Sequence, residues 1–375
     1  MASDGKGVEA IPHNCYTAGM APTFVRPNVR ATHGYSPGEQ PGVGERVVKL
    51  NTNENPFPPS PKVMQAIREL EPESLRRYPQ PRADDFRNAA AKALGVTADM
   101  ILAGNGSDDI LTIATRTFIP PGGTLAYPSP TYSLYQVLAD LEEAKVLTVP
   151  WGDDWSLPID ALLATKANAI YLVNPNAPSG SVVPPETVSK LAEKFDGLLL
   201  VDEAYADFAD TNCLGLLDKH DNVVISRTLS KSYCLAGLRF GYAVARPEVI
   251  HEMMKVKDSY NCDAIAIAAA TAAITDREYA KMTWDHVRGE RNRLSHELKA
   301  SGFDVLPSQA NFLLAAVPGG DGAAMYRRLK HLGILVRHFD KDGLRQYVRI
   351  TIGTTAENNA LLCGVRELLA SEKAA

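Results

Sequence analysis

Short apolar stretches alternate with amphipathic ones from about residue 49 to residue 265, and this alternation constrains the fold more than any other feature. The apolar stretches consist largely of consecutive aliphatic residues, and most of them end in polar residues. They are GTLAYPSPTY (123–132), AIYLVNPN (169–176), GLLLVDEAY (197–205), NVVISRTLSK (222–231) and RFGYAVAR (239–246). Helical patterns such as PETVSKLAEKF (185–195) lie between them. The alternation predicts an α/β fold with a mostly parallel sheet that helices cover.

The pattern changes on both sides of this region. Residues 1–48 contain many Pro and Gly residues and little periodicity, so we expect an N-terminal arm on the substrate side. After residue 265 come a long charged helix (277–302) and a mixture of strand-like and helical segments. These segments are ANFLLAAV, a helix around 322–332, ILVRHF and QYVRITIG. We therefore expect a large domain at 49–265 and a smaller α+β C-terminal domain at 266–375.

Composition excludes several classes of protein. The chain has 44 acidic and 39 basic residues and a net charge of −5, so no basic excess indicates nucleic acid or an anionic membrane as partner. Its five cysteines are scattered without a C-x-x-C pair, and its histidines lack H-x-x-x-H spacing. We therefore expect no disulfide framework, no metal site and a cytoplasmic location. No apolar run has membrane-spanning length.

Polar residues follow several of the predicted strands. Because ligands of open α/β sheets collect beyond the carboxyl ends of the strands, these residues are expected at one shared edge. They are Tyr132, Asn174, Asn176, Asp202, Tyr205, Ser230 and Lys231. The plain alternative, in which they only form turns, would have to account for several strands at once.

Lys231 lies among small and apolar residues in SRTLSKSYCLAGLRFG (226–241). It is either a buried-stem lysine near a helix start or a desolvated amine nucleophile. The segment AGNGSDDILTIATRTF (103–118) has a Gly-rich turn before an apolar helix, which suits phosphate binding, although it also forms an ordinary N-cap. Asp202 follows four apolar residues, so its carboxylate is expected where the strand leaves the core. There it could cap a helix, form an ion pair or pair with a buried cation.

Together these groups suit pyridoxal 5′-phosphate. The cofactor has an aldehyde for a lysine amine, a phosphate, and a ring nitrogen that needs an adjacent carboxylate to stay protonated. Its ring oxygen can accept a hydrogen bond from the phenol of Tyr205, and its ring face can stack on an aromatic residue of PSPTYSLY.

From about Tyr35 to its end, the chain resembles the fold type I, pyridoxal-phosphate-dependent aminotransferases of the aspartate aminotransferase superfamily, and within them the histidinol-phosphate aminotransferases. The resemblance rests on the order of many short motifs, each weak alone. These are YSPGEQPG, KLNTNENPFPPSP, RRYPQP, GNGSDD, YPSPTYSLY, VDEAYADF, TLSKSYCLAGLRFG, PSQANFLL and VRITIGT.

The resemblance implies roles for individual residues. Lys231 would bond the cofactor aldehyde and carry the proton, Asp202 would hold the ring nitrogen, and Tyr205 the ring oxygen. Tyr132 would stack on the ring. The phosphate would be held by Gly106, Ser107, Asp108, Thr228, Ser230 and Arg239, and the substrate by Tyr35, Asn55, Arg337 and Arg349.

The resemblance also implies a homodimer with shared active sites, in which Tyr78 reaches the phosphate of the neighbouring subunit's cofactor. One motif departs from the family pattern. Many relatives place a second Asn, which bonds the ring oxygen, where this chain has Ala177 in NPNAPSG. Asn176, one residue earlier, is the candidate to replace it.

The implied reaction is a ping-pong amino transfer between L-histidinol phosphate and 2-oxoglutarate, giving imidazole-acetol phosphate and glutamate in histidine biosynthesis. Arg337 and Arg349 favour a phosphate-bearing substrate, since two guanidinium groups bind phosphate well. Aromatic amino acid aminotransferases and threonine-phosphate decarboxylases share almost every motif and stay open as alternatives. A non-catalytic sensor that binds pyridoxal phosphate is disfavoured because Lys231 is present, and a Rossmann nucleotide-binding protein because G-x-G-x-x-G is absent.

Overall fold

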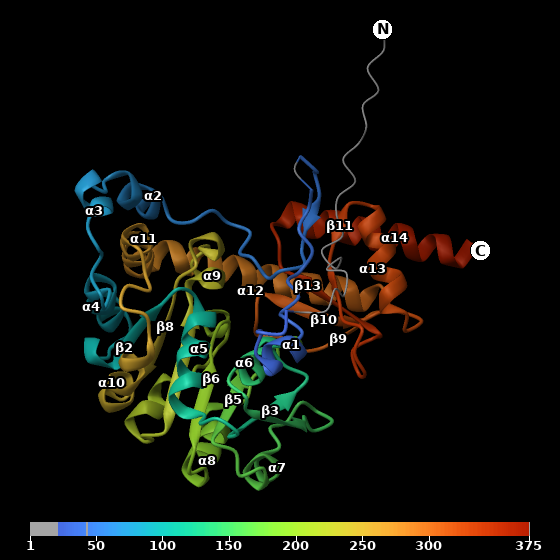
Figure 1. Ribbon diagram of the computed structural model, residues 1–375. Coiled ribbons are helices and arrows are strands. Elements are labelled where there is room, and N and C mark those ends of the chain that lie inside the picture. The colour runs from blue at the N-terminus through green and yellow to red at the C-terminus, as the bar shows by residue number, and fades with distance from the viewer. Residues whose placement is uncertain (1–21, 43, 375) are drawn as a thin grey trace.

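A seven-stranded sheet forms the centre of the structure, a computed structural model that describes residues 22–42 and 44–374 (Figure 1). Its strand order is β2-β8-β7-β6-β5-β3-β4, and neighbouring strands are parallel except in the two pairs that include β8. The strands are β2 (Ile101–Gly104), β3 (Thr124–Ser129), β4 (Lys145–Pro150), β5 (Ala169–Val173), β6 (Leu198–Asp202), β7 (Val223–Thr228) and β8 (Gly241–Ala245). The predicted α/β fold with a mostly parallel sheet is therefore confirmed.

Helices pack around this sheet because its central strands are apolar on both faces. Every residue of β5, β6, β7 and β8 is buried, as expected for strands covered on both sides. Helix α5 contacts β7 and β8, while α7 contacts β3. The helices of this region are α2 (Pro61–Arg68), α3 (Pro72–Arg76), α4 (Asp84–Leu94), α5 (Ser107–Phe118), α6 (Leu134–Leu141), α7 (Ile159–Ala164), α8 (Pro185–Lys194), α9 (Leu229–Ser232), α10 (Pro247–Val256) and α11 (Ala264–Thr275).

The antiparallel direction of β8 brings its first residues to the edge where the parallel strands end. Gly241 pairs with Gly104 at the end of β2 and with Thr228 at the end of β7. No side chain fits at Gly241, because a Cβ there would lie 2.4 Å from the backbone nitrogen of Ser107. The turns after β2 and β7 therefore meet the residues that precede β8.

A smaller antiparallel sheet, in the order β12-β13-β10-β9, forms the C-terminal part. Helix α13 packs against β12 and β13 of this sheet, and α14 packs against α13. Strand β11 pairs in parallel with β1 near the N-terminus. These elements are β1 (Val48–Lys49), β9 (Asp304–Val305), β10 (Phe312–Ala316), α13 (Gly322–His331), β11 (Ile334–Leu335), β12 (Arg337–His338), β13 (Tyr347–Thr351) and α14 (Thr355–Ala374). Helix α11 spans the predicted domain boundary at residue 265 and packs against α2 and α4 of the larger part. The boundary itself stays a prediction.

Helix α12 (Arg277–Ala300) joins the two parts of the molecule and lies along both in Figure 1. Near its start, Trp284 donates from its indole nitrogen to the carbonyl oxygen of Ser232 in α9, at 2.7 Å. Farther along, the carboxylate of Glu290 accepts a hydrogen bond from Asn358 in α14, at 2.7 Å. One continuous helix thus contacts both the Lys231 segment and the last helix.

The N-terminal segment also bridges the two parts. Near α1 (Pro27–Ala31), the amide of Asn28 donates to the carbonyl of Leu141 at the end of α6, at 3.1 Å. Farther along, the carboxylate of Glu39 accepts from the hydroxyl of Tyr326 in α13, at 2.7 Å. Residues 1–21 and 43 of the predicted arm lie outside the described residues.

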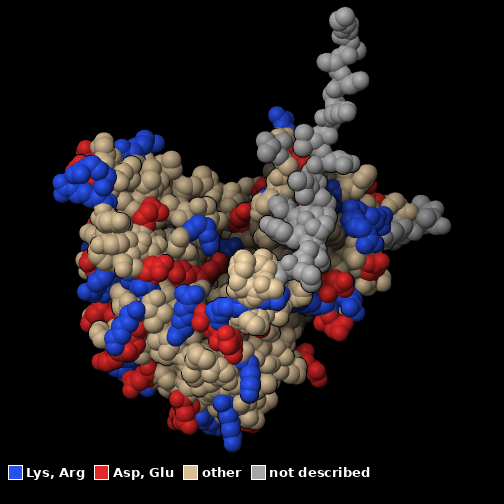
Figure 2. Space-filling model, viewed as in Figure 1, with Lys and Arg blue, Asp and Glu red and all other residues tan. Residues whose placement is uncertain are grey.

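Two strands of the large sheet were not among the predicted ones. β2 has only four residues, and β4 is an edge strand whose residues are mostly exposed, so neither shows a long apolar run. Acidic and basic side chains are interspersed over the face shown in Figure 2. Within residues 22–42 and 44–374, no helix has the length and apolar character needed to cross a bilayer.

Candidate active site

Lys231 presents a partly buried amine at the start of the site. Its Nζ donates to the carbonyl oxygen of Thr52 at 3.0 Å and pairs with no carboxylate of the described residues. Burial lowers the pKa of Lys231 to about 8, and the nearby Arg349 and Arg239 act in the same direction. A neutral amine is therefore available near neutral pH, as a nucleophile or a general base requires.

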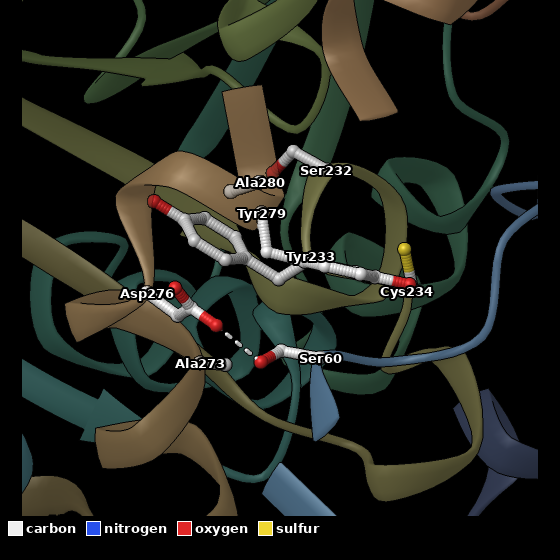
Figure 3. Close-up of a pocket in the computed structure, with 8 residues that line it drawn as sticks. All are labelled: Ser60, Ser232, Tyr233, Cys234, Ala273, Asp276, Tyr279 and Ala280. Carbon is white, nitrogen blue, oxygen red and sulfur yellow. Dashed lines mark hydrogen bonds between the residues drawn. The ribbon is translucent and has the colours of Figure 1, made fainter. Parts of the chain in front are cut away.

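The backbone around Lys231 is held on two sides. The side-chain amide of Asn55 donates to the Lys231 carbonyl at 3.0 Å, while Trp284 holds the next carbonyl. A cavity of about 10 Å³, roughly the space of one water molecule, is lined by Ser232 and by Ser60 and Asp276, which share a hydrogen bond (Figure 3). This cavity is too small for a cofactor, and it lies beside the residues that follow Lys231 in sequence.

Asp202 places a buried carboxylate at the end of β6, with only 3% of the residue exposed. One oxygen, Oδ2, accepts from the hydroxyl of Tyr135 at 3.1 Å, and the other accepts from the backbone nitrogen of Ala204 at 3.2 Å. Burial raises the pKa of Asp202, the nearby Asp108 and Glu203 act in the same direction, and the hydrogen bonds from Tyr135 and Ala204 act against them; the resulting pKa is about 7. No cation of the described part of the chain pairs with this carboxylate, so it suits a ligand that brings a positive charge.

Two tyrosines predicted to contact the cofactor lie beside Asp202. Tyr205 is buried, and its hydroxyl accepts a hydrogen bond from the side-chain amide of Asn53 at 3.0 Å. Tyr132 donates from its hydroxyl to the carboxylate of Asp108 at 3.2 Å. These two residues give the site a phenol and an aromatic face next to the buried carboxylate.

Asn176, the candidate for the ring-oxygen contact, is buried in its own loop. Its amide nitrogen donates to the hydroxyl of Ser179 at 2.9 Å, and its amide oxygen accepts from Thr131 at 3.3 Å. Asn174 likewise bonds the backbone of Val183. Both side chains stabilise this loop, and a contact from Asn176 to the cofactor stays a prediction.

Hydrogen-bond donors converge where β2, β7 and β8 meet. Arg239 reaches the hydroxyl of Ser230 at 3.4 Å and pairs with Asp108 at 3.2 Å. Gly106 has a φ of 90°, and a Cβ there would lie 2.8 Å from the Arg239 guanidinium. The residues predicted to bind the phosphate therefore lie together near the N-terminus of α5, where an anion binds favourably. They are Gly106, Ser107, Asp108, Thr228, Ser230 and Arg239.

Two arginines lie side by side at the edge of the small sheet. Arg337 in β12 pairs across the strands with Arg349 in β13. The Arg349 guanidinium lies over the rings of Phe312 and Phe339, and its buried Nε has no hydrogen-bond partner within residues 22–42 and 44–374. Burial lowers the pKa of Arg349, and Arg337 lowers it as well. Since neither guanidinium pairs with a carboxylate of the described residues, the pair suits an anionic ligand.

The remaining predicted residues are placed differently from one another. The ring of Tyr35 packs edge-on against Tyr132 with the ring centroids 5.7 Å apart, so Tyr35 borders the site. The amide of Asn55 is used by the Lys231 carbonyl, and its contact with a substrate stays a prediction. Tyr78 is 82% exposed and stacks on Tyr260, separate from the contacts around Lys231.

Sequence reasoning did not identify two residues that contact the site. Tyr135 bonds Asp202, and Asn53 bonds Tyr205. The only signal for Tyr135 is its place three residues after Tyr132 in PSPTYSLY, while Asn53 lies in the motif NTNENP.

The groups of this site fit pyridoxal phosphate. Among the described residues, Asp202 is a buried carboxylate without a cationic partner and Lys231 is an amine without a carboxylate partner, while the Arg239 cluster offers donors to a phosphate. Among the described residues, no group of three or more His, Cys, Asp or Glu side chains is arranged for a metal ion.

Comparisons with known proteins agree with this geometry. Residues 45–365 match the family described as aminotransferase class I and II. The chain is 46% identical to histidinol-phosphate aminotransferase 1 of Nostoc sp., over 93% of this chain and 99% of that protein. It is 44% identical to histidinol-phosphate aminotransferase of Rhodopirellula baltica, over 92% of this chain and 96% of that protein.

A solved structure is similar as well. The crystal structure of histidinol-phosphate aminotransferase from Sinorhizobium meliloti in complex with pyridoxal 5′-phosphate has a TM-score of 0.85 and 28% sequence identity. The similarity covers 94% of this chain and 99% of that one.

Proposed function

Because this chain belongs to the class I and II aminotransferase family, we propose that it transfers an amino group between L-histidinol phosphate and 2-oxoglutarate with pyridoxal phosphate as cofactor. When histidinol phosphate is the amino donor, the products are imidazole-acetol phosphate and glutamate. The observation that carries the proposal is a buried carboxylate, Asp202, and a low-pKa amine, Lys231, in a chain that shares 46% identity with a histidinol-phosphate aminotransferase.

When bound, pyridoxal phosphate supplies an aldehyde for the substrate amine and a cationic ring that withdraws electrons from the adjacent carbon. Asp202 would hold the ring nitrogen and favour its protonated form, because the buried carboxylate would gain a cation. Tyr205 would donate to the ring oxygen, and Tyr132 would cover the ring face. Lys231 would accept and carry the proton of the substrate carbon, which its pKa of about 8 allows near neutral pH.

The residues after β2 and β7 hold the cofactor phosphate. Backbone N–H groups at the start of α5 and the hydroxyl of Ser230 donate hydrogen bonds, and Arg239 supplies the charge. The glycine at position 106 leaves room for the Arg239 guanidinium.

Arg337 and Arg349 bind the anionic end of each substrate. A phosphate accepts several N–H bonds from two guanidinium groups, so the pair suits the phosphate end of histidinol phosphate. The carboxylate of glutamate would occupy the same pair in the other half-reaction.

The proposal includes a homodimer. A groove of about 620 Å³ lies between α2, α3 and α11, and Tyr78 lines it. The side chains of Tyr78 and of the nearby Leu75 are strongly exposed. Nearby, Ile265 of α11 is also exposed, in the apolar sequence AIAIAAATAAIT. A second copy would cover this apolar surface, and Tyr78 would then reach the phosphate site of its partner. We place the enzyme in the cytoplasm, where reduced cysteines are stable.

The substrate assignment is tested by measuring turnover of histidinol phosphate, phenylalanine and tyrosine by the purified enzyme with 2-oxoglutarate. We expect the highest kcat/KM for histidinol phosphate. A higher value for phenylalanine would overturn the assignment in favour of an aromatic aminotransferase, and a decarboxylated product from threonine phosphate would favour the decarboxylase.

The dimer is tested by mixing two inactive variants. Lys231→Ala removes the amine, and Tyr78→Ala removes the residue offered to the partner. Mixed dimers contain one site with both residues intact, so activity should return to about one quarter of the wild-type value for random exchange. Activity that stays absent after the subunits have exchanged argues against shared sites.

A further inference from the structure

Tyr135 contacts Asp202 from a part of the fold remote in sequence. It is the second residue of α6, whereas Asp202 ends β6, and the residue is 0% exposed. Its hydroxyl donates to Oδ2 of Asp202 at 3.1 Å. This is the one hydrogen bond that the described residues give to that oxygen.

The ring of Tyr135 is fixed by other aromatic rings. Tyr127, Tyr132 and Tyr171 all pack edge-on against it, with ring centroids 5.7, 5.8 and 5.2 Å away. Burial raises the pKa of Tyr135 well above its ordinary value, and the negative charge of Asp202 raises it as well. The phenol therefore stays protonated and remains a donor to the carboxylate.

Two neutral donors define how the Asp202 carboxylate lies. Tyr135 holds Oδ2, and the backbone nitrogen of Ala204 holds Oδ1 at 3.2 Å. With one bond on each oxygen, the carboxylate plane cannot turn without breaking one of them. From this geometry we propose that Tyr135 is a positioning residue that orients the Asp202 carboxylate toward the ring nitrogen of the cofactor and stabilises its ionised form.

The charges around Asp202 make this donor important. The negative charges of Asp108 and Glu203 lie near enough to favour the protonated form of Asp202, while Tyr132 and Tyr205 are neutral neighbours. Tyr135 is the side chain that acts in the opposite direction, by a hydrogen bond to the charged form. Without the phenol, the carboxyl would retain its proton to a higher pH and would be a poorer partner for a protonated ring.

The test compares Tyr135→Phe with a matched control, Tyr171→Phe. Tyr171 is equally buried and packs on Tyr135, but its hydroxyl bonds Thr115 at 2.9 Å instead of Asp202. The readouts are the equilibrium dissociation constant of pyridoxal phosphate from the apoprotein between pH 6 and pH 9, kcat and KM.

We expect Tyr135→Phe to bind the cofactor roughly ten-fold more weakly at pH 7, because a buried charged group loses a hydrogen bond. The pH midpoint of cofactor binding should move upward, and kcat should fall while KM for the amino donor changes little. Tyr171→Phe should leave the binding midpoint and kcat near the wild-type values. If the two variants behave alike, or if the midpoint does not move, Tyr135 is only a packing residue.

A double variant separates positioning from general damage. In an Asp202→Asn background, adding Tyr135→Phe should change the dissociation constant by less than about two-fold, since no carboxylate remains to be oriented. The inference rests on the proposed cofactor. A wild-type protein that does not bind pyridoxal phosphate refutes the proposed function, whereas normal binding by both wild type and Tyr135→Phe refutes this inference alone.

Discussion

The side-chain amide of Asn53 donates a hydrogen bond to the hydroxyl of Tyr205 across 3.0 Å, and this bond ties the N-terminal segment to the cofactor side of the site. The backbone of Asn53 is held by Thr351 of β13 and by Asn311 next to β10. Asn53 is buried and has a φ of 56°, in the left-handed region. The residue therefore joins three parts of the chain, including the strand that carries Arg349.

Replacing Asn53 separates its conformation from its hydrogen bonds. Asn53→Ala and Asn53→Gly both remove the amide, but only alanine is strained at a positive φ. We expect Asn53→Ala to be less stable than Asn53→Gly by about 1 kcal/mol in urea unfolding. Both should lose kcat to a similar extent because Tyr205 loses its donor. Equal stabilities of the two variants would mean that the backbone at position 53 leaves the left-handed region. An unchanged kcat would mean that the Asn53 amide does not contribute to catalysis.

The amine of Lys231 should react at an unusually low pH. With a pKa of about 8, its reductive methylation by formaldehyde in the apoprotein should reach half its maximal rate near pH 8. Peptide mass spectrometry of the segment that contains Lys231 measures this rate. Arg349→Met removes a nearby positive charge and should move the midpoint upward, whereas Arg345→Met, at an exposed position, should not. A rate that is still rising above pH 10 contradicts the lowered pKa.

Asp202 should destabilise the apoprotein above neutral pH. Its pKa is about 7 in the folded protein against 3.8 for an ordinary aspartate, so between these values the unfolded chain has released a proton that the folded protein retains. Stability therefore falls as the pH rises from about 4 to about 7 and stays low above that. Asp202→Asn should remove this loss and stabilise the apoprotein at pH 8 by about 2 to 4 kcal/mol, while abolishing activity.

Denaturant unfolding of the apoprotein at pH 5 and pH 8 measures this effect. Asp221→Asn is the control, since the Asp221 side chain is 88% exposed. The idea is wrong if Asp202→Asn gives the same gain at both pH values or no gain at all.

Arg349 should contribute to substrate binding through its planar shape as well as its charge. Arg349→Lys keeps the charge but loses the bidentate geometry, so KM for histidinol phosphate should rise roughly ten-fold or more. Arg345→Lys, which changes an exposed arginine paired with Asp340 and Asp342, should leave KM unchanged. Steady-state kinetics with both variants decides the matter, and an unchanged KM in Arg349→Lys would remove this residue from the anion site.

Much of the architecture could be predicted because its signal is local. Consecutive apolar residues predict β5, β6 and β7, and because parallel strands end at one edge of a sheet, Asp202 and Lys231 are expected at the same edge. Arg239 reaches that edge for a different reason. Since β8 is antiparallel, its beginning lies beside the end of β7, and the sequence does not show strand direction.

What could not be predicted depends on contacts between distant segments. Tyr135 reads as one more apolar residue on a helix, and its bond to Asp202 spans 67 positions. Asn53 and Thr351 are 298 positions apart. Asn55 was expected near the substrate, and only the structure shows that its side-chain amide donates a hydrogen bond to the Lys231 carbonyl.

Helix α12 has a consequence for how the C-terminus can affect chemistry. Its 24 residues form a rod of about 36 Å that touches α9 through Trp284 and α14 through Glu290. Direct contacts therefore lead from α14 through α12 to Ser232, the residue that follows the reactive amine. Removal of α14 would take away a partner of the helix that holds the Lys231 peptide.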